Sequence, residues 1–131
     1  MIVYYAYWNE YFGFRFSFPP EAADVPQWPQ SEPFPPLSPR VAIERSRAVV
    51  QQLLQEVHPF DPEFRACSLC NRSEQHEGYW YYIVSWSVPD LEDVRADWSE
   101  FAVPVLFDGS TPQPLKFRYE DRFDVYRTPA A

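Results

Sequence analysis

The feature that most constrains the fold is residues 78–88, GYWYYIVSWSV, the most strongly β-favouring run in the chain. Period-two alternation divides its side chains between two faces of a strand, with Trp80, Tyr82, Val84, Trp86 and Val88 on one and Tyr79, Tyr81, Ile83, Ser85 and Ser87 on the other. Both sets include large apolar or amphipathic side chains, which indicates cover on one face and partial cover on the other. We therefore predict that this run is the central strand of a sheet.

The length of 131 residues predicts a single domain over residues 1–131, because a core of that size buries enough surface without disulfides or a metal. Aromatic residues make up 19% of the chain, which excludes global disorder. The 15 prolines against three glycines predict stiff, non-repetitive segments between the regular elements.

The net charge of -8 argues against a nucleic-acid or anionic-membrane partner, since no basic patch would dominate such a field. It favours a basic protein partner, although surplus acid is also the ordinary means by which a small domain stays soluble. The N-terminus lacks the basic and apolar regions of a signal peptide, and no run approaches the roughly 20 apolar residues of a membrane span. We therefore expect a cytoplasmic protein.

Residues 1–18 are predicted to form strands, with alternate phenylalanines from position 12 to position 18 on one face. A tight hairpin at Asn9-Glu10 is the favoured interpretation, and one long bent strand with a bulge near Gly13 is the alternative. A glycine within a strand pattern also fits a close approach by another part of the chain.

Residues 19–39 carry eight prolines, a density that forbids both a helix interior and a central strand. We predict an extended loop of polyproline II character, held over the domain surface by apolar anchors at Val25, Trp28, Phe34 and Leu37. This segment is called the strap below. Two PxxP spacings in it match SH3-type ligands, but at this proline content such matches are nearly inevitable.

A helix is predicted over residues 40–58, with Ser38 as its N-cap and Pro39 at its first position. One face carries a stripe of apolar and small residues, formed by Ala42, Ile43, Ser46, Val49, Val50, Leu53, Leu54 and Val57. We expect Ser46, which is small, to let a bulky strand residue approach the helix closely. His58-Pro59 ends the helix, because the residue before a proline is pushed out of the α region.

Residues 64–119 are predicted to form antiparallel strands, at positions 64–72, 78–88, 101–107 and 115–119. A short helix or turn is expected over residues 90–98, and Asp108-Gly109 predicts a hairpin between the last two strands. Beyond Phe123 we expect the chain to fray, apart from an anchor at Val125 or Tyr126.

These elements together predict an α+β fold, in which one long helix packs on a curved antiparallel sheet of about five to six strands. The order of elements from residue 38 to residue 119 resembles that of cystatin-like and related helix-on-sheet folds. The resemblance is one of element order alone, so it carries over no functional residues.

Catalytic and metal chemistry find little support in the sequence. Cys67-x-x-Cys70 is a candidate redox pair or half of a zinc site, but a structural zinc needs four ligands and no second such pair exists. In an extended strand the two cysteines also point to opposite faces, which favours two half-buried thiols. The sequence has no G-x-S-x-G elbow and no glycine-rich phosphate loop. We therefore expect no cofactor, no metal and no enzymatic activity. The alternative is an enzyme whose site brings together a cysteine, a histidine and a carboxylate.

Three groups of residues are candidate binding surfaces: an acidic run beside a tryptophan, the aromatic residues of the central strand, and the aromatic residues of the strap. The acidic run with its tryptophan consists of Asp90, Glu92, Asp93, Asp97 and Trp98. The central-strand residues are Tyr79, Tyr81 and Trp86, and the strap residues are Trp28 and Phe34. We predict a non-enzymatic protein-binding module, a small acidic protein of the immunity or inhibitor type. The alternative is a small-ligand-binding domain with an aromatic pocket between the sheet and the strap, and an exposed edge strand would equally support a homodimer.

Overall fold

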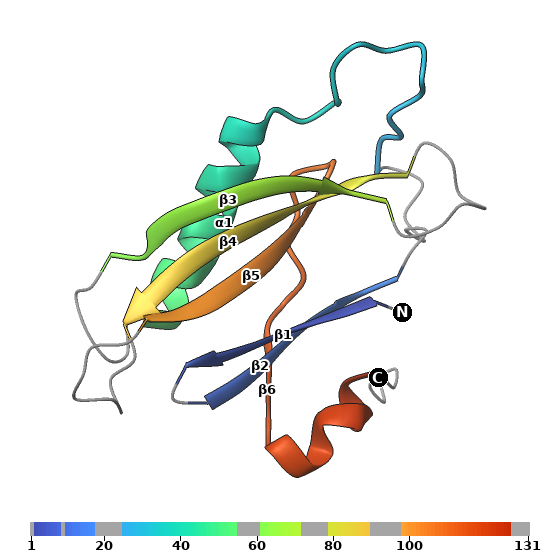
Figure 1. Cartoon of the computed structure of the whole chain (residues 1–131). Coiled ribbons are helices and arrows are strands. Elements are labelled where there is room, and N and C mark those ends of the chain that lie inside the picture. The colour runs from blue at the N-terminus through green and yellow to red at the C-terminus, as the bar shows by residue number, and fades with distance from the viewer. Residues whose placement is uncertain are drawn as a thin grey trace.

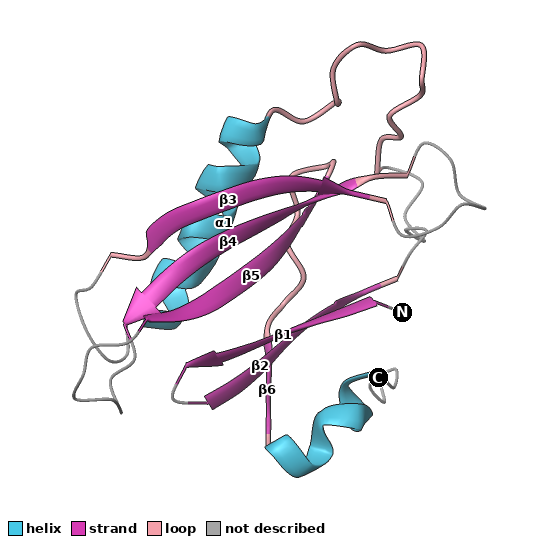
Figure 2. Cartoon of the chain, viewed as in Figure 1, coloured by secondary structure: helices cyan, strands magenta, loops and turns pink. Residues whose placement is uncertain are grey.

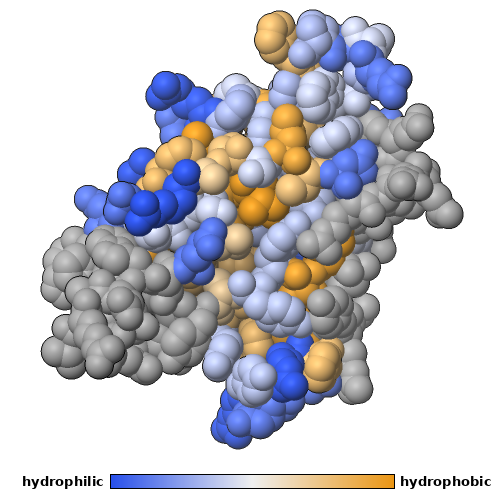
Figure 3. All heavy atoms as spheres, in the orientation of Figure 1, coloured by the Kyte–Doolittle hydropathy of each residue, from blue (hydrophilic) through white to orange (hydrophobic). Residues whose placement is uncertain are grey.

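The computed structural model describes residues 2–8, 10–17, 25–54, 61–71, 79–89 and 98–126. In chain order, its elements are β1 (Ile2–Trp8), β2 (Glu10–Phe16), α1 (Pro39–Leu54), β3 (Glu63–Cys70), β4 (Tyr81–Pro89), β5 (Trp98–Leu106), β6 (Leu115–Phe117) and the 3-10 helix η1 (Tyr119–Tyr126) (Figures 1 and 2). The predicted α+β class with antiparallel strands is therefore confirmed. In the space-filling view, the most hydrophobic side chains gather toward the middle of the visible face, between more hydrophilic ends (Figure 3). No helix among the described residues combines the length and the apolar character needed to span a membrane.

The strands form two three-stranded antiparallel sheets, and the prediction of one curved sheet is wrong. Sheet A has the order β1-β2-β6 and sheet B the order β3-β4-β5. A tight turn does form at Asp108-Gly109, where Gly109 takes a positive φ of 85° and its N–H donates to the Leu106 carbonyl, but the predicted hairpin between the last two strands is wrong. The chain beyond it does not return along β5, however, because residues 110–114 include two prolines that cannot donate to a ladder. The strand β6 pairs instead with β2, in sheet A.

The strand β4 lies at the centre of sheet B, as predicted, between β3 and β5. Its side chains alternate between two covered faces. One face is fully buried and carries Tyr82, Val84, Trp86 and Val88. On the other face Tyr81 is also buried, because Tyr4 of β1 and Phe16 of β2 pack against its ring.

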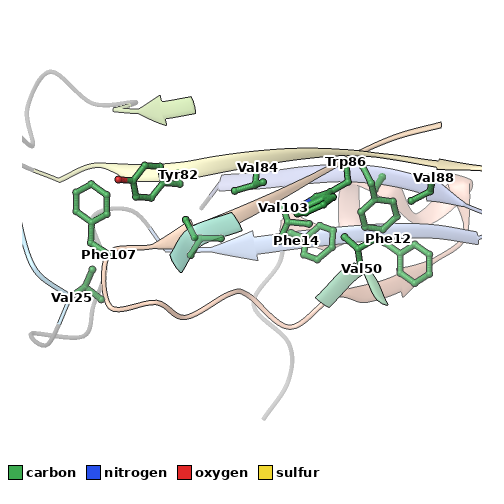
Figure 4. Close-up of a cluster of buried hydrophobic side chains, with 14 residues drawn as sticks. Phe12, Phe14, Val25, Val50, Tyr82, Val84, Trp86, Val88, Val103 and Phe107 are labelled. Carbon is green, nitrogen blue, oxygen red and sulfur yellow. The ribbon is translucent and has the colours of Figure 1, made fainter. Parts of the chain in front are cut away.

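The predicted hairpin at Asn9-Glu10 is confirmed, since β1 pairs with β2 in antiparallel register up to Trp8 opposite Glu10. The inner face of this hairpin carries Phe12 and Phe14, whose ring centroids lie 5.8 and 5.7 Å from that of Phe101 in β5. Figure 4 shows these two rings directed toward buried side chains of sheet B and α1. Both sheets and the helix therefore share one hydrophobic core, in which each fully buried large side chain contributes about 1.5–3 kcal/mol.

The helix α1 starts as predicted, with the Ser38 hydroxyl accepting a hydrogen bond from the Val41 N–H at 3.3 Å. Its apolar stripe covers sheet B, and Ser46 lies fully buried in it. The Trp86 indole N–H donates to the Ser46 hydroxyl at 2.9 Å, and that hydroxyl donates to the Ile43 carbonyl at 2.9 Å. The expected close approach of a bulky strand residue at Ser46 is thus confirmed. The described helix ends at Leu54, and residues 55–60, where its predicted end falls, lie outside the described residues.

The described part of the strap, residues 25–38, is held at three of its four predicted anchors. Val25 is buried, Trp28 packs edge-on against Trp80 at 5.5 Å, and Leu37 is partly buried in the core. The Tyr82 hydroxyl also donates to the Leu37 carbonyl at 2.6 Å. The prediction of an anchor at Phe34 is wrong, because its side chain is 79% exposed.

The C-terminal segment is ordered further than expected. Residues 119–126 form η1, so the prediction of fraying beyond Phe123 is wrong for the part that the structure describes. The predicted anchor at Val125 is confirmed, because its side chain is buried against Gly13 of β2. A Cβ added at Gly13 would lie 2.7 Å from Val125 Cγ1, which explains why this strand position requires glycine.

Candidate functional site

Two of the predicted binding residues on the central strand belong to the core. Trp86 and Tyr81 are fully buried. The indole of Trp86 is held by Ser46, and the hydroxyls of Tyr81 and Tyr4 share a hydrogen bond of 2.7 Å. Neither side chain presents a surface to a partner, whereas Tyr79 at the entry to the strand is half-buried.

The two strap aromatics are placed differently from each other. Trp28 is half-buried, and its indole N–H donates to the Glu32 carbonyl at 2.9 Å, which ties the strap to itself. Phe34 lies on the outer side of the same loop in solvent. The small-ligand pocket predicted between the sheet and the strap would use both of these aromatic side chains, and that of Phe34 is directed away from the sheet.

The acidic run predicted as a binding surface, Asp90, Glu92, Asp93 and Asp97, lies outside the described residues and stays a prediction. Trp98 opens β5 opposite Pro89, so the predicted short helix or turn over residues 90–98 is wrong at its last residue.

The two cysteines form no disulfide and are half-buried on β3. Cys67 pairs with Val84 and Cys70 with Tyr81, so they face opposite sides of sheet B, as predicted. Burial, with a smaller contribution from Cys70, raises the pKa of the Cys67 thiol. A raised pKa lowers the thiolate fraction and makes this a poor nucleophile. Within the described ranges, no three residues among His, Cys, Asp and Glu come together as a metal site.

The outer face of sheet A carries a pocket that the sequence did not predict. The pocket has a volume of about 360 Å³. Its lining comes from all three strands of sheet A and from η1, and consists of Tyr5, Tyr11, Phe117, Tyr119, Arg122 and Phe123. We call it the aromatic pocket.

Strand register places the aromatic side chains of the pocket on one face. Tyr11 of β2 lies directly opposite Phe117 of β6, and Tyr5 of β1 lies opposite Gly13. The Phe117 ring is then 5.6 Å from the Tyr5 ring and 5.7 Å from the Tyr11 ring. Tyr119, the first residue of η1, extends this cluster and lies 5.5 Å from Tyr11. The floor of the pocket is therefore built from packed rings at distances typical of aromatic pairs.

The helix η1 is fastened over this face by contacts at its middle and near its C-terminal end. The Tyr5 hydroxyl donates to the Arg122 carbonyl at 2.9 Å, and an Arg15 guanidinium nitrogen donates to the Val125 carbonyl at 3.2 Å. Gly13 leaves the space that the buried Val125 side chain occupies. These contacts fix the rim of the pocket relative to its floor.

The rim of the pocket carries one positive charge, on Arg122. Its guanidinium lies over the Tyr119 ring at 4.2 Å and over the Phe123 ring at 4.6 Å, and it donates to the Tyr119 carbonyl at 3.0 Å. Tyr119 and Phe123 are 53% and 68% exposed, so this stacked trio is open to a partner. In Figure 3, the end of the molecule formed by η1 shows hydrophilic and hydrophobic side chains side by side.

The sequence held a partial signal for this site. Alternation in residues 11–18 places Tyr11, Gly13 and Arg15 together on one face, but no helix was expected over residues 119–126 to cover that face. Neither a protein-family model, nor a curated protein, nor a solved structure matches the chain. What the pocket can bind is therefore deduced from its own residues.

Proposed function

We propose that this protein is a non-enzymatic, single-domain binding module that holds an extended segment of a protein partner in the aromatic pocket. The observation that carries the proposal is the half-open pocket of five aromatic rings with one guanidinium at its rim. Grooves lined by aromatic side chains bind proline-rich or aromatic segments, since rigid rings give contact area at a small cost in conformational entropy. No carboxylate, imidazole or thiol is among the six lining residues, so within this lining the tyrosine hydroxyls are the only candidates for proton transfer, which favours binding.

The charges of the protein indicate which charged groups the expected partner carries. Arg122 favours a segment in which a carboxylate lies close to an apolar ring, because an arginine binds a carboxylate while stacked on aromatic faces. The net charge of -8 favours encounter with a partner that is basic overall. The proposal includes two expectations from the sequence. One is that the protein is cytoplasmic and of the immunity or inhibitor type, and the other is that the element order of α1 and sheet B is cystatin-like.

Selection of peptides from a random phage-displayed library on the full chain tests the proposal. We expect selected peptides to carry an aromatic or proline residue near an acidic one. Phe123→Ala should weaken their binding by about 1–2 kcal/mol, or about fivefold to thirtyfold, as for a central aromatic contact. Leu69→Ala is the matched control, because it also removes an exposed apolar side chain, on β3 in the other sheet. Peptides that bind the wild type and Phe123→Ala equally well would contradict the proposal.

A second candidate function is binding of a small aromatic ligand in the same pocket. Its support is the volume of about 360 Å³, within the range of about 300–1,000 Å³ of small-molecule sites. Benzoate, phenylacetate and indole-3-acetate are suitable probes, since each offers a ring for the pocket floor and a carboxylate for Arg122. Saturable NMR shifts at Tyr119 with one of them, together with no selected peptide, would favour this candidate.

A further inference from the structure

The strap presents a preformed aromatic side chain that the fold does not use. Phe34 is 79% exposed and lies between Pro33 and Pro35. Its loop is held in shape by a turn in which the Glu32 N–H donates to the Pro29 carbonyl at 3.0 Å, and by the bond from Trp28 to the Glu32 carbonyl. A ring on a stiff, anchored loop loses little entropy when it binds, so it is well suited to insertion into a pocket.

This loop matches the aromatic pocket in both shape and charge. An aromatic ring flanked by prolines is the kind of segment that a tyrosine-lined groove binds. Glu32 is exposed two residues before Phe34, and its carboxylate is complementary to the guanidinium of Arg122 at the pocket rim. The segment 32–36 thus combines the ring and the carboxylate that the pocket favours.

The strap and the pocket lie at opposite ends of the molecule, so a strap cannot fill the pocket of its own chain. Figure 1 shows the loop before α1 at one end and η1 at the other, with both sheets between them. We propose that the occupant of the aromatic pocket is the strap of a second copy of this chain, with Phe34 inserted among the rings and Glu32 paired with Arg122. This inference rests on the proposed function of the pocket as a site for an extended segment. It replaces the basic partner favoured by the net charge of -8 with a second acidic copy, whose long-range repulsion is screened beyond about 8 Å at about 0.15 M salt. A contact between two different surfaces is heterologous, so copies associate head to tail.

Sedimentation of the full chain over a range of concentrations tests this association. We expect the wild type to form species larger than a monomer with increasing concentration. Phe34→Ala and Phe123→Ala should each self-associate about fivefold to thirtyfold more weakly than the wild type, and both should keep the wild-type circular dichroism spectrum because the two side chains are exposed. An equimolar mixture of the two variants should form one-to-one pairs and nothing larger, because only one intact strap and one intact pocket are then available. A wild type that stays monomeric up to about 1 mM, the limit of weak specific binding, would overturn the inference.

Reversal of the two charges gives an independent test. Glu32→Arg and Arg122→Glu should each weaken self-association by about fivefold or more, since each places like charges together. The chain that carries both substitutions should recover most of the wild-type association. Equal weakening in the double variant would overturn the assigned contact between Glu32 and Arg122.

A strap peptide separates this inference from the proposed function. We expect a peptide of residues 25–38 to bind the full-length Phe34→Ala variant, and to bind a chain that also carries Phe123→Ala more than fivefold more weakly. If the strap peptide does not bind, but library peptides or phenylacetate bind in a Phe123-dependent manner, self-association is overturned and the function of the pocket stands. If no probe binds in a Phe123-dependent manner, both are overturned.

Discussion

A buried hydrogen bond between Trp86 and Ser46 joins sheet B to α1, and Ser46→Ala is the perturbation that tests its contribution to stability. Both side chains are fully buried, and the indole N–H donates to the hydroxyl at 2.9 Å. Removal of the hydroxyl leaves this N–H buried without its acceptor, which costs about 1–3 kcal/mol. The Ile43 carbonyl loses only a donor, since a carbonyl within a helix can still accept a backbone bond.

Urea denaturation followed by far-ultraviolet circular dichroism measures this loss. With an m value of about 2 kcal/mol/M, a loss of about 2 kcal/mol lowers the midpoint by about 1 M. Ala48→Ser on the exposed face of α1 is the control, and its effect should stay within about 0.5 kcal/mol.

A double-mutant cycle then separates the hydrogen bond from the packing of the ring. Trp86→Phe keeps an aromatic ring but removes the donor, so it should cost about 1–2 kcal/mol less in the Ser46→Ala background than in the wild type. Additive effects of the two substitutions, or a Ser46→Ala variant as stable as the wild type, would refute the reasoning.

Three further predictions concern other parts of the molecule. Gly13→Ala should lower the free energy of unfolding by about 1–3 kcal/mol, because its Cβ would lie 2.7 Å from Val125 Cγ1 and displace η1; wild-type stability in urea would contradict this. Burial raises the pKa of the Cys67 thiol above its ordinary 9.0, with a smaller contribution from Cys70. Burial also raises the pKa of the Tyr82 hydroxyl above its ordinary 10.0, with a smaller contribution from Cys67. As the pH rises, the unfolded chain therefore loses these two protons before the folded chain does. Stability should therefore be unaffected by these two groups below pH 9 and fall as the pH rises further, and denaturation from pH 8 to pH 11 should show a smaller fall in Tyr82→Phe than in the wild type. Phe34→Ala should change thermal stability by no more than about 0.5 kcal/mol, because the side chain is 79% exposed, and a larger loss would show that the strap depends on it.

Local chemistry explains which elements could be predicted from the sequence. The alternation in residues 78–88, the capping residue Ser38 and the break at Asn9-Glu10 each act within a few residues, and the structure has a central strand, a helix start and a hairpin at those places. The expected role of Ser46 also followed from its place in the apolar stripe, although its partner Trp86 did not.

The division into two sheets depends on a choice that local chemistry does not make. The turn at Asp108-Gly109 forms as expected, and the prolines of residues 110–114 interrupt a ladder beside β5, but they do not specify that β6 then joins β2. The aromatic pocket has the same origin. Its residues come from β1, β2, β6 and η1, which are joined only after both sheets and Val125 are in place.

The central claim, that the aromatic pocket binds a segment of a partner, is tested most directly by calorimetric titration of one library-selected peptide into three full-length chains. Binding to the wild type should show a negative heat-capacity change, as expected for burial of apolar surface. The affinity should be about tenfold lower for Phe123→Ala and unchanged for Leu69→Ala. Equal affinity for all three chains, or equal loss in both variants, would contradict the claim.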